Sequence, residues 1–506
     1  MIRANRLTIV VILVGVLYSL FLQTFIRDEV FYSGDAGLKA LLAKQFNHGL
    51  SDVALNLPAP DWAKDLWNQG YYPFAPIFVY TISGRHFIAF DFLFSLITAP
   101  FYQAFGYRGL YVVPLLSIWL VWLIFFFICR RAELNDTQSA LAFASLIFSS
   151  PLTIYSALYW EHTLATALVL FSFFLFLWSE PRTSLRGFVG GLLLSVSIFF
   201  RPEVYCLVIA TLVVMYTIKT PLTTTQKGSF LSGCLAGLFA LWLSNHWIYG
   251  SFIGIHSFVV TKTYSLLQHA AIYFLILKFL IAQLILFFPI VFFCAISLFK
   301  HLTNDSEKLI WFPSPMWVLL LAVILLVPAV VPNYGGKQWG PRYYLIILPF
   351  VCMCAMWTLK ASQSLRPMMR NALMIVFLIC FSFGVYKNTY AGTVDLREDY
   401  AVRVLPALQE IRQRPERVVV VSQQHVAQEM ESLLDQKIFF RSLANADLQR
   451  MAPSFVENGA SSFLFVNHLI ENEPQSFQSG GYGFRFSKIG NFGIYRLFLV
   501  AIQPTS

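Results

Sequence analysis

The sequence is short of charged residues. Only 12% of its 506 residues are Asp, Glu, Lys or Arg, whereas 57% are hydrophobic, and a typical soluble domain carries roughly 25% charged residues. This composition excludes a soluble globular protein and also a disordered chain, which needs low hydrophobicity. The alternation of apolar and polar residues that marks an outer-membrane β-barrel is missing too. Instead, apolar runs continue for about 20 residues, the length that a helix needs to cross a bilayer.

Several chemical signatures are also missing. The seven cysteines all fall within or at the ends of apolar runs, so no disulfide framework is expected. The sequence has no His-x-x-x-His, no Asp-x-Asp and no carboxylate cluster with metal-ligand spacing, so the residues themselves predict no metal site. The glycine-rich stretch at 479–483 is followed by no helical pattern, which favours a hairpin turn over a nucleotide-binding loop.

Basic residues orient the apolar runs, because cytoplasmic loops of membrane proteins are enriched in Lys and Arg. Arg3 and Arg6 precede the first run, at 7–26, which reads as an uncleaved helix because it is long and no small-residue cleavage site follows. Arg130 and Arg131 end a later run. We therefore expect the N-terminus and this arginine pair to lie on the inner side.

The stretch at 87–105 decides whether this orientation is consistent. If it crossed the membrane, every later loop would invert, so we expect a juxtamembrane helix along the outer surface; Asp91 within it also disfavours a lipid-facing span. Inner loops then hold 13 basic and 5 acidic residues. Further helices are expected at 137–158, 163–179, 187–200, 204–218, 229–248, 271–299, 315–331, 343–359 and 371–387. This arrangement predicts about 11 spans, with the N-terminus inside and the C-terminus outside.

The composition changes from about residue 388. Residues 388–506 contain 11 basic and 12 acidic residues, no cysteine, and only short apolar runs rich in β-branched and aromatic residues, separated by helical patterns. We therefore predict a polytopic α-helical membrane protein with a transmembrane domain at 1–387 and a small C-terminal α/β extracytoplasmic domain at 388–506. The first outer loop, at about 27–108, is long and carries seven acidic residues.

Asp35 is the acidic residue of most interest in this loop. Gly34 and Gly37 are expected to let the backbone turn tightly around it, and 36–46 reads as an interfacial helix with Asp35 near its N-terminus. One interpretation is a helix N-cap. The other is a carboxylate held at the membrane surface as a general base. Asp28, directly after the first helix, competes for the same role.

The other outer segments carry an excess of positive charge, against the tendency of basic residues to lie inside. Glu161 and Glu203 stand against six basic residues, namely Arg201, Lys262, Lys278, Lys337, Arg342 and Lys387. A phosphate group at the membrane surface is the simplest anionic partner, because Arg offers a bidentate fork and Lys a point charge. The structural alternatives are an Arg201–Glu203 pair that neutralises itself, a Lys278 that snorkels, and contacts with lipid headgroups. The rest of the positive net charge lies in the inner loops, where it sets the orientation of the helices. It therefore does not indicate a nucleic-acid partner, and we exclude one.

Four short segments carry a family resemblance. They are Gly-Asp-Ala-Gly-Leu-Lys at 34–39, Trp-Glu-His at 160–162, Phe-Arg-Pro-Glu at 200–203 and Gln-Trp-Gly-Pro-Arg-Tyr at 338–343. With the long first outer loop, the number of spans and the C-terminal outer domain, the chain resembles the GT-C superfamily of membrane glycosyltransferases. These enzymes use polyprenyl- or dolichyl-phosphate sugars and include protein O-mannosyltransferases and the lipid A aminoarabinose transferase. The sequence departs from the mannosyltransferase pattern because its first loop lacks a His-Pro-Pro, which leaves the acceptor class open.

The resemblance implies an inverting transfer at the outer face of a membrane, with the bacterial inner membrane favoured. Asp35 would deprotonate an acceptor hydroxyl on a glycan, lipid or protein, and the polyprenyl phosphate of the donor would leave. Candidate phosphate-binding residues are Arg342, Lys337, Arg201 and Lys278, and other candidate site residues are Glu161, His162, Glu203 and Tyr343. Some members of the superfamily use a divalent metal, so a metal cofactor stays open. A lipid-linked sugar transporter or flippase, and a glycan polymerase or ligase with a diphosphate-linked donor, remain as alternatives.

Overall fold

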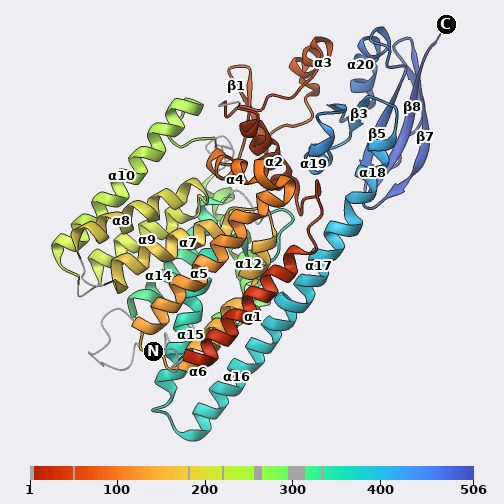
Figure 1. Cartoon of the computed structure of the whole chain (residues 1–506). Coiled ribbons are helices and arrows are strands. Elements are labelled where there is room, and N and C mark those ends of the chain that lie inside the picture. Colours follow the sequence, from red (N-terminus) through yellow and green to blue (C-terminus); the bar gives the residue numbers. More distant parts are fainter. Residues whose placement is uncertain are drawn as a thin grey trace. The chain divides into compact units, whose positions relative to one another are not determined.

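The computed structural model describes residues 5–49, 52–179, 183–218, 222–255, 265–293, 314–331 and 335–505. These residues form two compact units (Figure 1). Unit 1 comprises the described residues of Met1–Thr24 and Tyr111–Val394, and unit 2 comprises those of Phe25–Leu110 and Asp395–Ser506. The long segment expected as the first outer loop therefore folds together with the C-terminal part of the chain.

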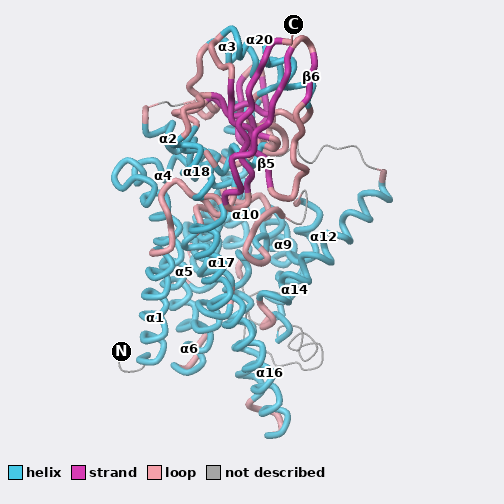
Figure 2. Tube along the Cα trace, turned by 90° about the vertical axis from the view of Figure 1, so that its right-hand side faces the viewer, coloured by secondary structure: helices cyan, strands magenta, loops and turns pink. Residues whose placement is uncertain are grey.

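The described residues of unit 1 form helices joined by loops and turns and contain no strand, as Figure 2 shows in cyan and pink. Its elements are α1 (Arg6–Gln23), α5 (Val112–Arg131), α6 (Asp136–Ala144), η4 (Ser145–Ser149), η5 (Pro151–Ala157), α7 (His162–Phe173), η6 (Phe174–Trp178), α8 (Ser184–Val196), η7 (Ser197–Phe199), α9 (Val204–Thr217), α10 (Thr224–Tyr249), α12 (Leu266–Phe287), α14 (Ser314–Val330), η8 (Arg342–Ile347), α15 (Leu348–Ser362), α16 (Pro367–Val385) and η9 (Tyr386–Ala391). The helix α17 (Gly392–Glu398) runs across the boundary between the units.

The helices identify a multi-pass membrane protein. Within the described residues, 6 helices are long and apolar enough to cross a bilayer, or 7 if the bent pair Asp136–Ser149 and Pro151–Ala157 forms one span. Four further apolar helices are shorter, namely His162–Trp178, Ser184–Phe199, Val204–Thr217 and Met316–Val330. The expected total of about 11 spans stays a prediction, because length and composition establish only the smaller number.

Glycines bring α8 and α10 into close contact in unit 1 (Figure 1). A Cβ atom on Gly191 would lie 2.0 Å from the carbonyl oxygen of Phe230, and one on Gly233 would lie 2.0 Å from that of Phe188. The Ser195 hydroxyl also donates a hydrogen bond across the interface, to the carbonyl of Cys234 at 3.0 Å. Close backbone approach through small residues is how membrane helices associate when lipid removes the hydrophobic driving force.

Unit 2 combines helices with two sheets. Its elements are α2 (Gly34–Asn47), α3 (Asp61–Leu66), η2 (Trp67–Tyr71), β1 (Val79–Ile82), β2 (Arg85–Ile88), α4 (Phe92–Phe105), η10 (Asp399–Arg403), α18 (Leu405–Gln413), β3 (Val418–Val421), α19 (Gln424–Glu429), η11 (Glu431–Leu433), β4 (Ile438–Arg441), α20 (Asn445–Glu457), β5 (Ser462–His468), β6 (Phe477–Ser479), β7 (Tyr482–Phe492) and β8 (Tyr495–Pro504). The short 3-10 turn η3 (Gly106–Tyr111) leads from α4 to α5.

The larger sheet has the strand order β4-β3-β5-β8-β7-β6. β3 pairs in parallel with both β4 and β5, with Val420 opposite Phe440 on one side and Phe465 on the other. The pairs β5–β8, β8–β7 and β7–β6 are antiparallel. All four residues of β3 are buried valines, as expected for a central parallel strand covered on both faces. The small α/β domain predicted near the C-terminus thus has a mixed sheet.

The stretch expected as one helix at 87–105 is divided in the structure. Residues Arg85–Ile88 form β2, and the helix α4 begins only at Phe92. The expected start of the helix is therefore wrong, because this part of the chain pairs with β1 instead. Asp91 is the N-cap of α4, and its side chain accepts a hydrogen bond from the backbone N–H of Leu93 at 2.8 Å. With 14 residues and a rise of about 1.5 Å per residue, α4 alone is shorter than the hydrocarbon core of about 30 Å. Its juxtamembrane placement stays a prediction.

Candidate functional site

Asp35 lies in the first turn of α2, within unit 2. The N-cap of this helix is Ser33, not Asp35. The expectation that Gly34 and Gly37 turn the chain is wrong, because both residues are part of the helix. They instead allow α19 to approach closely: a Cβ on Gly37 would lie 1.9 Å from the carbonyl oxygen of Gln428, and one on Gly34 would lie 2.3 Å from the side-chain Oε1 of the same residue. The two glycines therefore fix the half-buried Asp35 against the C-terminal part of the chain.

The far end of α2 is held by a buried ion pair. Lys44 Nζ lies 3.3 Å from Glu431, 3.0 Å from Asp435 and 3.3 Å from the hydroxyl of Tyr107. Burial opposes the charge of Lys44, but the two carboxylates outweigh it and raise the pKa of the lysine. Burial also raises the pKa of Glu431, and Lys44 counteracts part of that effect. Both ends of α2 are thus anchored to residues from the last quarter of the chain.

Asp28, the competing carboxylate, is already paired. It lies 3.0 Å from Arg108 Nε, and its side chain is 63% exposed. An exposed pair of this kind contributes only about 0–1 kcal/mol to stability. The neighbouring Glu29 forms an ion pair with Arg412. Asp28 and Glu29 therefore each belong to a partly exposed ion pair of unit 2.

Unit 1 brings three of the predicted residues together in a buried ion network. Arg201 Nε donates to Glu203 Oε1 at 2.8 Å, and Arg201 Nη1 donates to Glu161 Oε1 at 3.2 Å. All three residues are buried. The self-neutralising Arg201–Glu203 pair considered from the sequence is present, and Glu161 adds a second carboxylate. The positive charge of Arg201 is therefore balanced by the carboxylates of Glu161 and Glu203.

The second arginine packs against aromatic rings beside this network. The Tyr343 ring lies 5.7 Å from the guanidinium carbon of Arg201 and 5.0 Å from that of Arg342. Arg342 also lies 5.7 Å from the ring of Trp160 and donates to the Tyr343 hydroxyl at 3.1 Å. The His162 ring is 5.2 Å from Trp160. We call Glu161, Arg201, Glu203, Arg342 and Tyr343 the arginine cluster.

The lysines are arranged differently from the arginines. Lys337 is half-buried in the loop that leads to η8. Lys278 is exposed on α12, which begins at Leu266 and not at 271 as expected, so it lies more than three turns into the helix. Lys387 lies 4.7 Å from the ring of Phe287 and 5.4 Å from that of Trp339. Lys262 falls outside the described residues. The arginine cluster itself contains two arginines and two glutamates, so its formal charges balance.

Sequence reasoning missed a polar network beside Trp339. The Tyr155 hydroxyl donates to the carbonyl of Trp339 at 2.8 Å, and Trp339 Nε1 donates to the side chain of Asn388 at 3.2 Å. Asn388 Nδ2 in turn donates to the carbonyls of Ser149 and Phe287 at 2.7 and 2.6 Å. In the sequence, Asn388 is a single polar residue close to the expected domain boundary, and it belongs to no motif or periodic pattern that predicts a buried site. Its burial in the π-helical η9, a rare geometry that often marks functional sites, is visible only in the structure.

The described part of the chain contains no group of three or more His, Cys, Asp or Glu side chains placed to hold a metal ion. Polar and charged groups gather instead in the arginine cluster of unit 1 and around α2 in unit 2.

No family model matches the sequence, and no curated protein matches it at a significant level. The structure, however, matches ArnT from Cupriavidus metallidurans with a TM-score of 0.53, at 11% sequence identity, over 96% of this chain and 97% of that one. The fold is that of ArnT. ArnT has been solved bound to undecaprenyl phosphate and in the apo state, and this chain matches both equally. The match confirms, at the level of the fold, the resemblance that the sequence suggested.

The chain also matches the apo form of the Archaeoglobus fulgidus oligosaccharyltransferase. The TM-score is 0.46 at 9% identity, over 90% of this chain and 69% of that one.

Proposed function

We propose that the protein is a membrane glycosyltransferase that moves a sugar from a polyprenyl-phosphate donor to an acceptor hydroxyl, with inversion. The observation that carries this proposal is the ArnT fold along 96% of the chain, since that structure has been solved with undecaprenyl phosphate bound. In our proposal the N-terminus is cytoplasmic, the reaction takes place at the outer face, and the membrane is a bacterial inner membrane. The acceptor is a glycan, a lipid or a protein.

Asp35 is proposed as the general base. A base must hold a deprotonated carboxylate at a fixed position within hydrogen-bond reach of the acceptor hydroxyl. The contact of Gly34 and Gly37 with Gln428 supplies the fixed position, and the half-buried side chain keeps access to substrate. The deprotonated hydroxyl would attack the anomeric carbon of the donor, and the bond between that carbon and the phosphate oxygen would break. Asp28 is the weaker candidate because its side chain is 63% exposed, so its position is less fixed.

Arg342 is proposed as the principal ligand of the leaving phosphate. Its side chain is half-buried and packs on two aromatic rings. Positive charge placed where negative charge develops lowers the barrier most effectively when it is already oriented. Arg201 is held by two carboxylates, so we assign it a positioning role through the Tyr343 ring. Lys337 and Lys278 are proposed as secondary contacts of the phosphate.

The decisive experiment is transfer from polyprenyl-monophosphate sugars in proteoliposomes. We expect the Asp35→Asn variant to lose transfer by about 10²–10⁴-fold, the usual contribution of a general base, while it inserts and melts like the wild type. Asp65→Asn is the matched control, because Asp65 is an exposed aspartate in α3 of the same unit, and it should transfer normally. Near-normal transfer by Asp35→Asn would refute the assignment of Asp35 as the general base.

The same assay separates the competing functions. Transfer only from a diphosphate-linked donor would indicate a polymerase or ligase. Movement of the intact lipid-linked sugar between leaflets without transfer would indicate a transporter. Activity measured in the presence of a chelator would decide whether a divalent metal takes part.

A further inference from the structure

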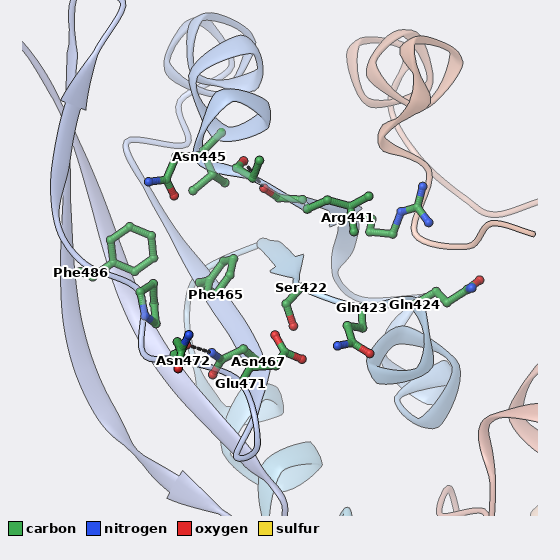
Figure 3. A pocket seen from close by; sticks show the side chains of 15 residues that line it. Ser422, Gln423, Gln424, Arg441, Asn445, Phe465, Asn467, Glu471, Asn472 and Phe486 are labelled. Carbon is green, nitrogen blue, oxygen red and sulfur yellow. Dashed lines mark hydrogen bonds between the residues drawn. The ribbon is translucent and has the colours of Figure 1, made fainter. Parts of the chain in front are cut away.

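Unit 2 contains a second candidate site, separate from α2 and Asp35. A cavity of about 500 Å³ opens at the carboxyl ends of the three parallel strands β3, β4 and β5 (Figure 3). Ser422 and Gln423 follow β3, residues 442–445 follow β4, which ends at Arg441, and Asn467 lies near the end of β5. The volume falls in the range of about 300–1,000 Å³ that is typical of small-molecule sites.

The sheet topology explains why a cavity forms here. The chain leaves β3 through α19 and enters β4 on one side, and it leaves β4 through α20 and enters β5 on the other side of β3. The two connections run in opposite directions, so right-handed crossovers place their helices on opposite faces of the sheet. The loops after β3 and β4 therefore diverge. A crevice at such a switch point, outside the carboxyl ends of the strands, is where open α/β sheets bind ligands.

Three buried oxygen atoms in the wall of this cavity lack a hydrogen-bond partner. Within the residues that the structure describes, none donates to or accepts from Ser422 Oγ, Asn467 Oδ1 or Glu471 Oε1. Asn467 is only 2% exposed, and its Nδ2 is held by the carbonyl of Asn472 at 2.9 Å, so its free oxygen has a fixed direction. A buried polar group without a partner costs about 1–3 kcal/mol. Three around one cavity indicate a ligand that brings several hydrogen-bond donors.

Part of the lining is aromatic. The rings of Phe465 and Phe486 lie 5.5 Å apart at 82°, and together they form an apolar corner (Figure 3). Arg441 and Glu471 are the two charged residues of the lining, so their formal charges balance and the cavity favours a neutral ligand. A ligand that offers both hydroxyl donors and apolar C–H faces, as a sugar ring does, fits this lining.

We propose that this cavity binds a neutral saccharide. Ser422, Asn467 and Glu471 would accept hydrogen bonds from its hydroxyl groups, and Phe465 and Phe486 would pack against its C–H faces. This inference goes beyond the transferase function and does not depend on it, since it concerns binding and no bond is made or broken.

The test uses the full-length protein in lipid nanodiscs, without any donor. Saturation-transfer NMR measures binding of neutral trisaccharides of glucose, mannose, galactose and N-acetylglucosamine, with inorganic phosphate as the anionic probe. We expect the wild type to bind at least one trisaccharide, and Asn445→Trp, which places an indole at the rim of the cavity, to weaken that binding by at least tenfold. The matched control is Ala446→Trp, at the adjacent exposed position of α20 that does not line the cavity, and it should bind like the wild type.

A second pair of variants tests the polar wall without adding bulk. Glu471→Gln removes the proposed acceptor charge and should weaken saccharide binding severalfold, whereas Glu473→Gln, two residues away at an ion pair with Lys488, should not. The proposal is overturned if no trisaccharide binds, if Asn445→Trp binds like Ala446→Trp, or if phosphate displaces the saccharide. Because no donor is present, failure here leaves the proposed transferase function unaffected, and loss of transfer leaves this inference unaffected.

Discussion

The contact between α2 and α19 gives the sharpest test of how the Asp35 site is built. In a Gly37→Ala variant, the added methyl carbon would lie 1.9 Å from the carbonyl oxygen of Gln428, and the nearest atom it meets is backbone. Ordinary van der Waals contact begins at 3.4 Å, so the two helices must separate by more than an ångström. Overpacking of this kind costs about 1–3 kcal/mol, and the better helix propensity of Ala returns up to about 1 kcal/mol.

We therefore expect Gly37→Ala to destabilise unit 2 by about 1–2 kcal/mol, which lowers the melting temperature by roughly 2–8 °C. Gly34→Ala should cost less, because its new methyl meets first the end of the flexible Gln428 side chain. Gly228→Ala in α10 has no neighbouring atom within 4 Å and should be neutral or slightly stabilising. The measurement is thermal unfolding of the three purified variants, together with transfer activity. If Gly37→Ala melts no lower than Gly34→Ala, the close packing of α2 on α19 is refuted.

The remaining predictions concern charge. Arg342→Ala should raise KM for the polyprenyl-phosphate donor at least tenfold and leave KM for the acceptor nearly unchanged. The control Lys360→Ala, which removes a positive charge at the far end of α15, should change neither KM. Equal effects of Arg342→Ala on both substrates would contradict the proposed contact with the phosphate. Glu203→Ala leaves the buried guanidinium of Arg201 with Glu161 as its one remaining carboxylate of this network. The free energy of unfolding, measured on the detergent-solubilised protein, should fall by about 3–5 kcal/mol. An unchanged free energy of unfolding would show that this ion network does not stabilise the protein. Burial lowers the pKa of His425 and His468, so their contribution to stability is complete above about pH 6.5 and is lost as the pH falls through the lowered pKa values. Unit 2 should melt earlier at pH 5 than at pH 7, and replacement of both histidines by Gln should reduce that difference.

The sequence predicted the membrane class and the C-terminal sheet region, because both depend on composition and on short patterns of residues. Arg201 and Glu203 are two positions apart, and this spacing alone is enough to suggest that they pair. The second carboxylate, Glu161, comes from 40 residues earlier in the chain, and no local pattern indicates which distant segment supplies it.

The glycines around Asp35 show a different limit of prediction. Gly in the segment 34–37 suggested a turn, because glycine tolerates unusual backbone angles. In the structure, Gly37 lies so close to the backbone of Gln428, nearly 400 residues later in the chain, that a larger side chain would clash with it. The saccharide cavity has the same origin, since it follows from the order in which three strands join the sheet. Composition does not encode that order.

The construction of unit 2 from two distant segments has a consequence for biosynthesis. Residues Phe25–Leu110 leave the ribosome long before Asp395–Ser506, and at typical rates of synthesis the interval is roughly 15–60 s. During this time the glycine face of α2 and Lys44 have no partners, because Gln428 and Glu431 do not yet exist. A chain that ends prematurely after α16 would keep its membrane helices but would never complete the surroundings of Asp35. Nonsense mutations late in the gene should therefore be as damaging as the loss of the proposed base itself.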